Sequence, residues 1–154
     1  MKLFQIEEPD GSPSDTDAPG AAIGIDASGK LTEVAFAVGG NAVILADREG
    51  FERDLPVPAP DALLVAWQAL FEGARLRAER ALARPVTHAV LVFAASLDPA
   101  LAAELLKASE AAEIELLRIV TAGDLASGDT PAEGAAILAE DMAPRLEAPM
   151  GDRP

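Results

Sequence analysis

Cysteine is absent from this sequence, and aromatic residues make up only 4% of it. Without cysteine, the chain has no disulfide, no thiolate zinc site and no cysteine nucleophile. Hydrophobic residues account for 50% of the chain, so a core can form. With so few aromatic rings, that core has to consist mainly of alanine, leucine, valine and isoleucine.

Long apolar segments are also missing. No run approaches the roughly 18 apolar residues that a membrane-spanning helix needs. The first residues, MKLFQIEEPD, lack the apolar stretch that follows the lysine of a signal peptide. We therefore expect a soluble protein located in the cytoplasm.

Basic residues are scarce. The chain has 12 Lys and Arg against 26 Asp and Glu, which gives a net charge of −14. Binding to nucleic acid or to an anionic membrane requires concentrated positive charge, so neither partner is expected. Another protein or a second copy of this chain is the expected partner.

The composition divides the chain into a folded part and two tails. Residues 1–20 contain three Pro, two Gly and five acidic residues against one lysine, which is typical of a flexible segment. Residues 147–154 resemble that segment. The remaining residues, 21–146, have the size of a single domain.

Three short β-rich segments open the folded part, at residues 21–26, 31–38 and 41–46. Ser-Gly-Lys separates the first two segments, and Gly-Gly separates the second from the third. These residues are typical of hairpin turns because Gly tolerates a positive φ. The segments therefore predict a three-stranded antiparallel meander.

Helices and strands alternate after the meander. The predicted elements are a helix within 60–85 with Asp61 near its cap, a buried strand at 87–95, a helix opened by Asp98-Pro99, a strand at 114–120, and a helix that begins at the capping box of Thr130 and Glu133 and ends at Pro144. In the first helix, the predicted apolar stripe is Leu63, Trp67, Leu70, Ala74 and Ala78. The order β-β-β-α-β-α-β-α predicts an α/β domain with a mixed sheet.

Three stretches resemble the N-terminal lobe of the nucleotide-binding domain of DnaK-type heat-shock chaperones. GIDASGKLTEVAF is similar to the family's first strand and phosphate hairpin, and GGNAVILADREGFERDLP to its second hairpin. The segment from Pro85 to Val120 follows the family's strand–helix–strand segment without a gap. The resemblance implies a ribonuclease H-like mixed sheet, the unit that actin-like ATPases use twice, present here as a single lobe.

The resemblance also implies a ligand. In the family, the first aspartate and the hairpin after it hold nucleotide phosphates and magnesium. At the matching positions of this sequence, the nucleotide-binding residues would be Asp26, Ser28, Gly29 and Lys30, with Asp26 reaching the magnesium ion. ATP or ADP with magnesium is the implied ligand.

The sequence differs from the family at the positions that the family uses for catalysis. Lys30 and Leu31 stand where small polar residues contact phosphate, and the subdomain with an essential lysine is missing after Pro60. The acidic segment expected after Val120 is replaced, although Glu133 could stand in for its acid. The second lobe of the family's nucleotide-binding domain is also expected to be absent. Because phosphoryl transfer depends on clamped charged groups, these losses favour a non-catalytic protein without a cofactor.

Three functional hypotheses follow from the sequence. The first is a non-catalytic DnaK-like lobe that acts by binding another protein or itself. The second is a nucleotide-binding module whose cleft a second copy or a partner lobe completes. The third is a metal-dependent nuclease that gathers strand-end acids, namely Asp26, Asp98, Asp124 and Asp129.

Two further features of the sequence are a cluster of arginines and a histidine. Four arginines in the carboxyl-terminal half of the first helix offer a surface for an acidic partner segment: Arg75, Arg77, Arg80 and Arg84. The alternative is a solvated helix face that complements the helix dipole. His88 is the only histidine, and it is expected to be a surface residue at the start of a strand.

Overall fold

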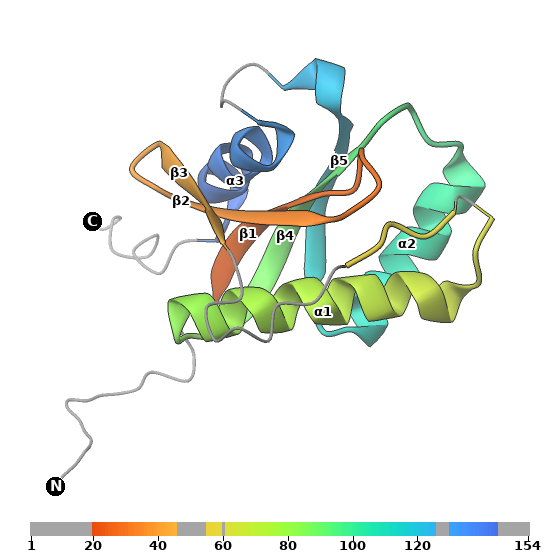
Figure 1. Ribbon diagram of the computed structural model, residues 1–154, viewed down its shortest axis with the longest axis horizontal. Helices are drawn as coiled ribbons and strands as arrows, with labels where there is room; N and C mark the ends of the chain where they lie inside the picture. The colour runs from red at the N-terminus through yellow and green to blue at the C-terminus, as the bar shows by residue number, and fades with distance from the viewer. Residues whose placement is uncertain (1–19, 46–54, 60, 126–129, 145–154) are drawn as a thin grey trace, which may run out of the picture. The chain divides into compact units, whose positions relative to one another are not determined.

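Five strands form one mixed sheet in the part of the chain that the structure describes (Figure 1). The structure is a computed structural model, and it describes residues 20–45, 55–59, 61–125 and 130–144. The strands are β1 Ala21–Asp26, β2 Glu33–Val38, β3 Asn41–Leu45, β4 Val86–Phe93 and β5 Glu115–Thr121. Their spatial order is β3-β2-β1-β4-β5. β1 pairs antiparallel with β2, and β2 with β3, whereas β4 is parallel to both β1 and β5. The predicted meander and the α/β class are therefore confirmed.

Three α-helices within the described ranges cover the two faces of this sheet: α1 Leu64–Leu82, α2 Pro99–Ala111 and α3 Pro131–Met142. α1 and α2 pack on one face, and α3 lies on the other (Figure 1). Together, the strands and helices form a compact unit from Gly20 to Ala143. Of the two predicted tails, 1–20 and 147–154, only Gly20 belongs to the described residues.

Helix boundaries follow the predicted capping residues in two of three cases. Asp98 is the N-cap of α2, and its carboxylate accepts a hydrogen bond of 2.8 Å from the backbone N–H of Leu101. Thr130 and Glu133 form the capping box that starts α3. At α1, the N-cap is Leu63, whose side chain makes no capping bond.

The predicted stripe of α1 is correct except at its first member. Trp67, Leu70, Ala74 and Ala78 are buried against the sheet, whereas Leu63 is 76% exposed. Leu63 precedes the first helical residue, so helical periodicity does not govern the direction of its side chain.

β4 lies in the centre of the core, and both of its faces are covered. Leu91 and Phe93 point to the face of α1 and α2, and Val90 and Val92 point to the face of α3. This burial confirms the prediction of a strand covered on both sides.

Helix α3 lies unusually close to β1. A Cβ atom placed on Gly24 would lie 2.5 Å from the backbone oxygen of Ala132 and would also overlap the backbone N of Ala136. The side of α3 that faces the sheet consists of small residues: Ala132, Ala135, Ala136 and Ala139. Backbone therefore packs on backbone at Gly24, and the alanine-rich composition of α3 makes this contact possible.

Candidate functional site

Asp26 ends β1, at the end of the sheet where the parallel strands β1, β4 and β5 terminate, and the residue is 8% exposed. Its Oδ1 atom accepts two hydrogen bonds from Ser28, one of 2.9 Å from the backbone N–H and one of 2.5 Å from the hydroxyl. An aspartate that bonds the residue two positions on forms a side-chain turn, which fixes the direction of the chain as it leaves the strand. Two of the predicted nucleotide-binding residues, Asp26 and Ser28, are thus in contact, but this contact is the local bond of a turn.

The rest of the β1–β2 turn is held by the segment Leu55–Val57. Leu31 and Pro56 form an antiparallel bridge. On either side of the bridge, Thr32 donates its N–H to the oxygen of Leu55 at 2.7 Å, and Val57 donates to the oxygen of Lys30 at 2.9 Å. Gly29 and the side chain of Lys30 remain exposed to solvent, and Leu31 is 50% exposed. The turn therefore presents an apolar side chain and a solvated lysine beside Asp26.

Among the described residues, two buried polar atoms near the carboxyl ends of the strands have no hydrogen-bond partner: the hydroxyl of Thr32 and the indole N–H of Trp67. Thr32 is buried and immediately precedes β2, at the end of β2 that pairs with Asp26 of β1. Trp67 stacks on Phe93, the last residue of β4, with ring centroids 5.4 Å apart. Both unpaired atoms therefore lie towards the carboxyl ends of β1 and β4.

The three proposed nuclease acids that the structure describes do not form a metal-binding group. Asp98 caps α2, and Asp124 accepts a hydrogen bond of 3.4 Å from the backbone N–H of Thr121. Glu133, the candidate replacement for the family's acid, bonds the backbone N–H of Thr130 in its own capping box. Asp129 lies outside the described residues. Within the described ranges, no group of three or more acidic or histidine side chains is placed to hold a metal ion.

Of the four predicted arginines, three lie on α1 and the fourth, Arg84, follows its end. Arg75 bonds the backbone oxygen of Ala112 at 2.9 Å and forms an ion pair with Glu79, so it joins α1 to the end of α2. Arg77 is buried, whereas Arg80 and Arg84 are exposed. Arg77 and Arg80 share one side of the helix by their spacing, and Arg75 lies on a different side.

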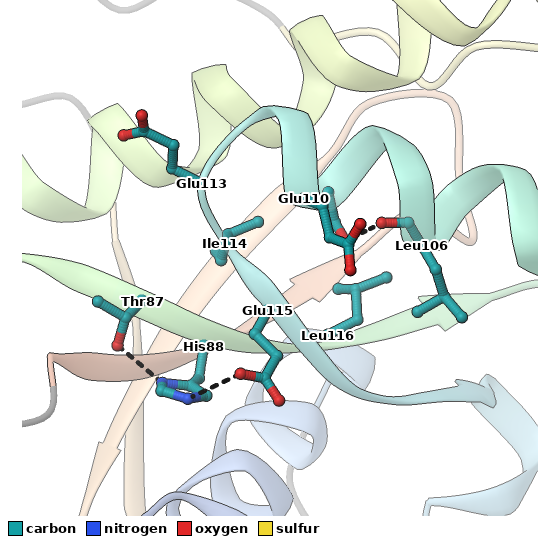
Figure 2. A pocket seen from close by; sticks show the side chains of 9 residues that line it. Thr87, His88, Leu106, Glu110, Glu113, Ile114, Glu115 and Leu116 are labelled. Carbon is teal, nitrogen blue, oxygen red and sulfur yellow. Dashed lines mark hydrogen bonds and ion pairs between the residues drawn. The ribbon is translucent and has the colours of Figure 1, made fainter.

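An open hollow of about 490 Å³ lies at the other end of the strands, where β4 and β5 begin (Figure 2). Its lining is Thr87, His88, Leu106, Ser109, Glu110, Glu113, Ile114, Glu115 and Leu116. Thr87 Oγ1 lies 2.7 Å from His88 Nδ1, and Glu115 Oε1 lies 3.5 Å from His88 Nε2. Figure 2 shows the Thr87, His88 and Glu115 side chains joined in a row. The sequence predicts His88 to be a surface residue, but its side chain is only 13% exposed and lines the hollow. The hollow itself was not predicted, because its walls come from segments far apart in the chain.

The hollow adjoins a strained residue, Glu113, whose φ is +66°. The N–H of Ile114 bonds the oxygen of Ser109, and the N–H of Glu113 bonds that of Glu110. This pair of bonds is the Schellman ending of a helix, in which the left-handed position favours glycine.

We expect Glu113→Gly to stabilise the protein by about 0.5–1 kcal/mol, because the substitution removes the strain of a left-handed non-glycine residue. Thermal unfolding measures the change. Glu113→Ala removes the same carboxylate but keeps a Cβ atom, so it should give no such gain. Equal gains in the two variants would attribute the effect to charge and contradict the backbone argument.

No protein-family model matches this chain, and no curated protein matches it. The resemblance to DnaK-type chaperones therefore stays a prediction. Among the helices of the described residues, none is both long and apolar enough to cross a membrane. The expected cytoplasmic location is a prediction too.

Proposed function

We propose that this protein is a non-catalytic lobe of the DnaK-like, ribonuclease H-like type, and that it acts by binding another protein or a second copy of itself. The strand order β3-β2-β1-β4-β5, with a meander followed by two parallel strands, supports the ribonuclease H-like part of the proposal. The Gly24-Ile25-Asp26 motif agrees with it, since Gly24 admits α3 and Asp26 ends the strand. Fold alone says little about activity, so the functional part depends on the site.

One observation carries the functional part: the Asp26 carboxylate is engaged by Ser28 in its own turn. A magnesium-nucleotide would need that carboxylate and a row of polar donors around the phosphates. Beside Asp26, the turn offers instead the exposed side chain of Leu31 and a single exposed lysine, Lys30. These groups do not supply the row of polar donors that phosphoryl transfer needs, whereas association with another protein does not require such donors.

A nucleotide-binding module remains the second candidate, because one observation favours it. Thr32 and Trp67 each bury a polar atom without a partner near the carboxyl edge of the sheet. A buried unpaired donor costs about 1–3 kcal/mol, so a ligand that bonded it would gain affinity. Ligands of open α/β sheets commonly bind at this edge.

Thermal unfolding with millimolar Mg-ATP or Mg-ADP separates the two candidates. A ligand present at a hundred times its dissociation constant adds about 2.7 kcal/mol, which raises Tm by roughly 5–10 °C for a chain of this size. We expect no shift for the wild type beyond that caused by magnesium chloride alone. A nucleotide-dependent shift that Asp26→Ala abolishes and Asp61→Ala retains would make the nucleotide-binding module the correct function.

A further inference from the structure

The β2–β3 hairpin has a two-residue turn whose geometry is well defined. Gly39 and Gly40 have φ values of +61° and +84°, which only glycine adopts readily and which are typical of a type I′ turn. The carboxylate of Glu140 on α3 accepts hydrogen bonds from both turn N–H groups, at 2.6 Å and 3.0 Å. The turn is therefore anchored to α3, and the register of the hairpin is fixed with it.

This register determines which backbone groups of β3 face outward. Val38 and Asn41 flank the two-residue turn, so they form a hydrogen-bonded pair. Hydrogen-bonded and non-hydrogen-bonded pairs alternate along an antiparallel ladder. The N–H and C=O groups of Val43 consequently point to β2, and those of Ala42 and Ile44 point away from it.

Within the described residues, β3 pairs with a neighbour on one side only, so it is an edge of the sheet. Its sequence, NAVIL, has no charge and no proline, and two of its apolar side chains are exposed: Val43 at 58% and Ile44 at 40%. The other edge, β5, carries Glu115 and Arg118, both exposed. Charges of that kind protect an edge strand from pairing with another chain, and β3 lacks them.

We propose that β3 is a self-association surface, and that a second copy of this chain pairs with it as an antiparallel strand. This inference rests on the proposed function and specifies its partner. A two-fold axis at Val43 is the register that pairs all of Asn41–Leu45, since Val43 is the middle residue of the strand. Ala42 then exchanges N–H···O bonds with Ile44 of the partner copy.

Side chains support the same register. The two Val43 residues form a non-hydrogen-bonded pair, in which side chains come closest together. Val38, which is 64% exposed, lies diagonally across from Val43 on the same face of the hairpin and adds apolar surface beside the axis. The two Val43 side chains therefore meet at the axis, and each Ile44 faces Ala42 of the partner copy, as the reciprocal contacts of an isologous interface require.

The distribution of charge favours β3 over the rest of the surface as the place where two copies meet. The net charge of −14 makes two copies repel each other over most of their surface. The uncharged strand β3 is a site where two copies can approach with little local repulsion. Association should consequently strengthen as salt concentration rises, because salt screens the remaining repulsion.

Analytical ultracentrifugation over a wide concentration range tests the pairing with Ile44→Pro and Ile44→Thr. Proline at position 44 removes an outward N–H and no bond to β2, whereas threonine keeps the N–H. We expect the wild type to dimerise, Ile44→Pro to raise the dissociation constant by about tenfold or more, and Ile44→Thr to retain the dimer. A wild-type monomer at all concentrations, or a dimer unaffected by Ile44→Pro, would overturn the inference.

Amide hydrogen exchange of the wild type, resolved by NMR, gives a second test that does not depend on a variant folding. The amides of Ala42 and Ile44 should gain protection with rising concentration, while the amide of Val43 stays protected throughout. Protection of all three that is independent of concentration would show that the edge is covered within one chain, which overturns the pairing. A nucleotide-induced Tm shift would refute the proposed function instead, and it would leave these exchange results unchanged.

Discussion

Gly24→Ala is expected to destabilise the protein by at least about 3 kcal/mol, and Gly24→Val by more. A Cβ atom at this position meets the backbone of α3 at Ala132 and Ala136. Side chains can change rotamer to admit an added group, but helix backbone cannot yield without moving α3 as a whole. The cost therefore lies at or above the upper end of the 1–3 kcal/mol that overpacked cores usually show. Denaturant unfolding followed by circular dichroism measures it.

Gly29 provides the matched control for Gly24. It lies in the turn after β1, and a Cβ atom placed on it meets no atom within 4 Å. Gly29→Ala should leave stability unchanged or raise it slightly, because alanine lowers the entropy of the unfolded chain. If Gly24→Ala were as harmless as Gly29→Ala, α3 would not pack on β1 in the way described.

Local sequence signals predicted most of the architecture. Residues 21–26 form β1 with the predicted bounds, and the capping residues Asp98 and Thr130 start α2 and α3. These signals are reliable because a strand's length and a cap's hydrogen bond depend on neighbours in sequence. The prediction that Leu63 belongs to the buried stripe is wrong, because α1 begins at Leu64 and no residue in the sequence marks that boundary.

The candidate site was less predictable, because its contacts join distant residues. Asp26 is an exception, because its bonds to Ser28 lie within one turn, but the family resemblance pointed to a ligand role for it. Nothing in the sequence indicated that Glu140 would hold Gly39, which is 101 positions away. The order of strands places β3 at an edge, and that order depends on the packing of the whole sheet.

Trp67→Ala is expected to cost about 3–5 kcal/mol, the range for truncating a large buried aromatic residue. Trp67 is 1% exposed and belongs to the core between α1 and the sheet. Its ring also stacks on Phe93, and alanine would lose this contact together with the packing. Because Trp67 is the only tryptophan, unfolding of the variant has to be followed by circular dichroism.

Trp67→Phe distinguishes the packing of this ring from its unpaired N–H. Phenylalanine keeps a ring that can stack on Phe93, and it removes a buried donor that has no partner. Relief of that donor offsets part of the lost volume, so the variant should lie within about 1 kcal/mol of the wild type. A loss as large as that of Trp67→Ala would mean that the indole N–H is bonded in solution, which would remove one of the two observations that favour a ligand at this edge.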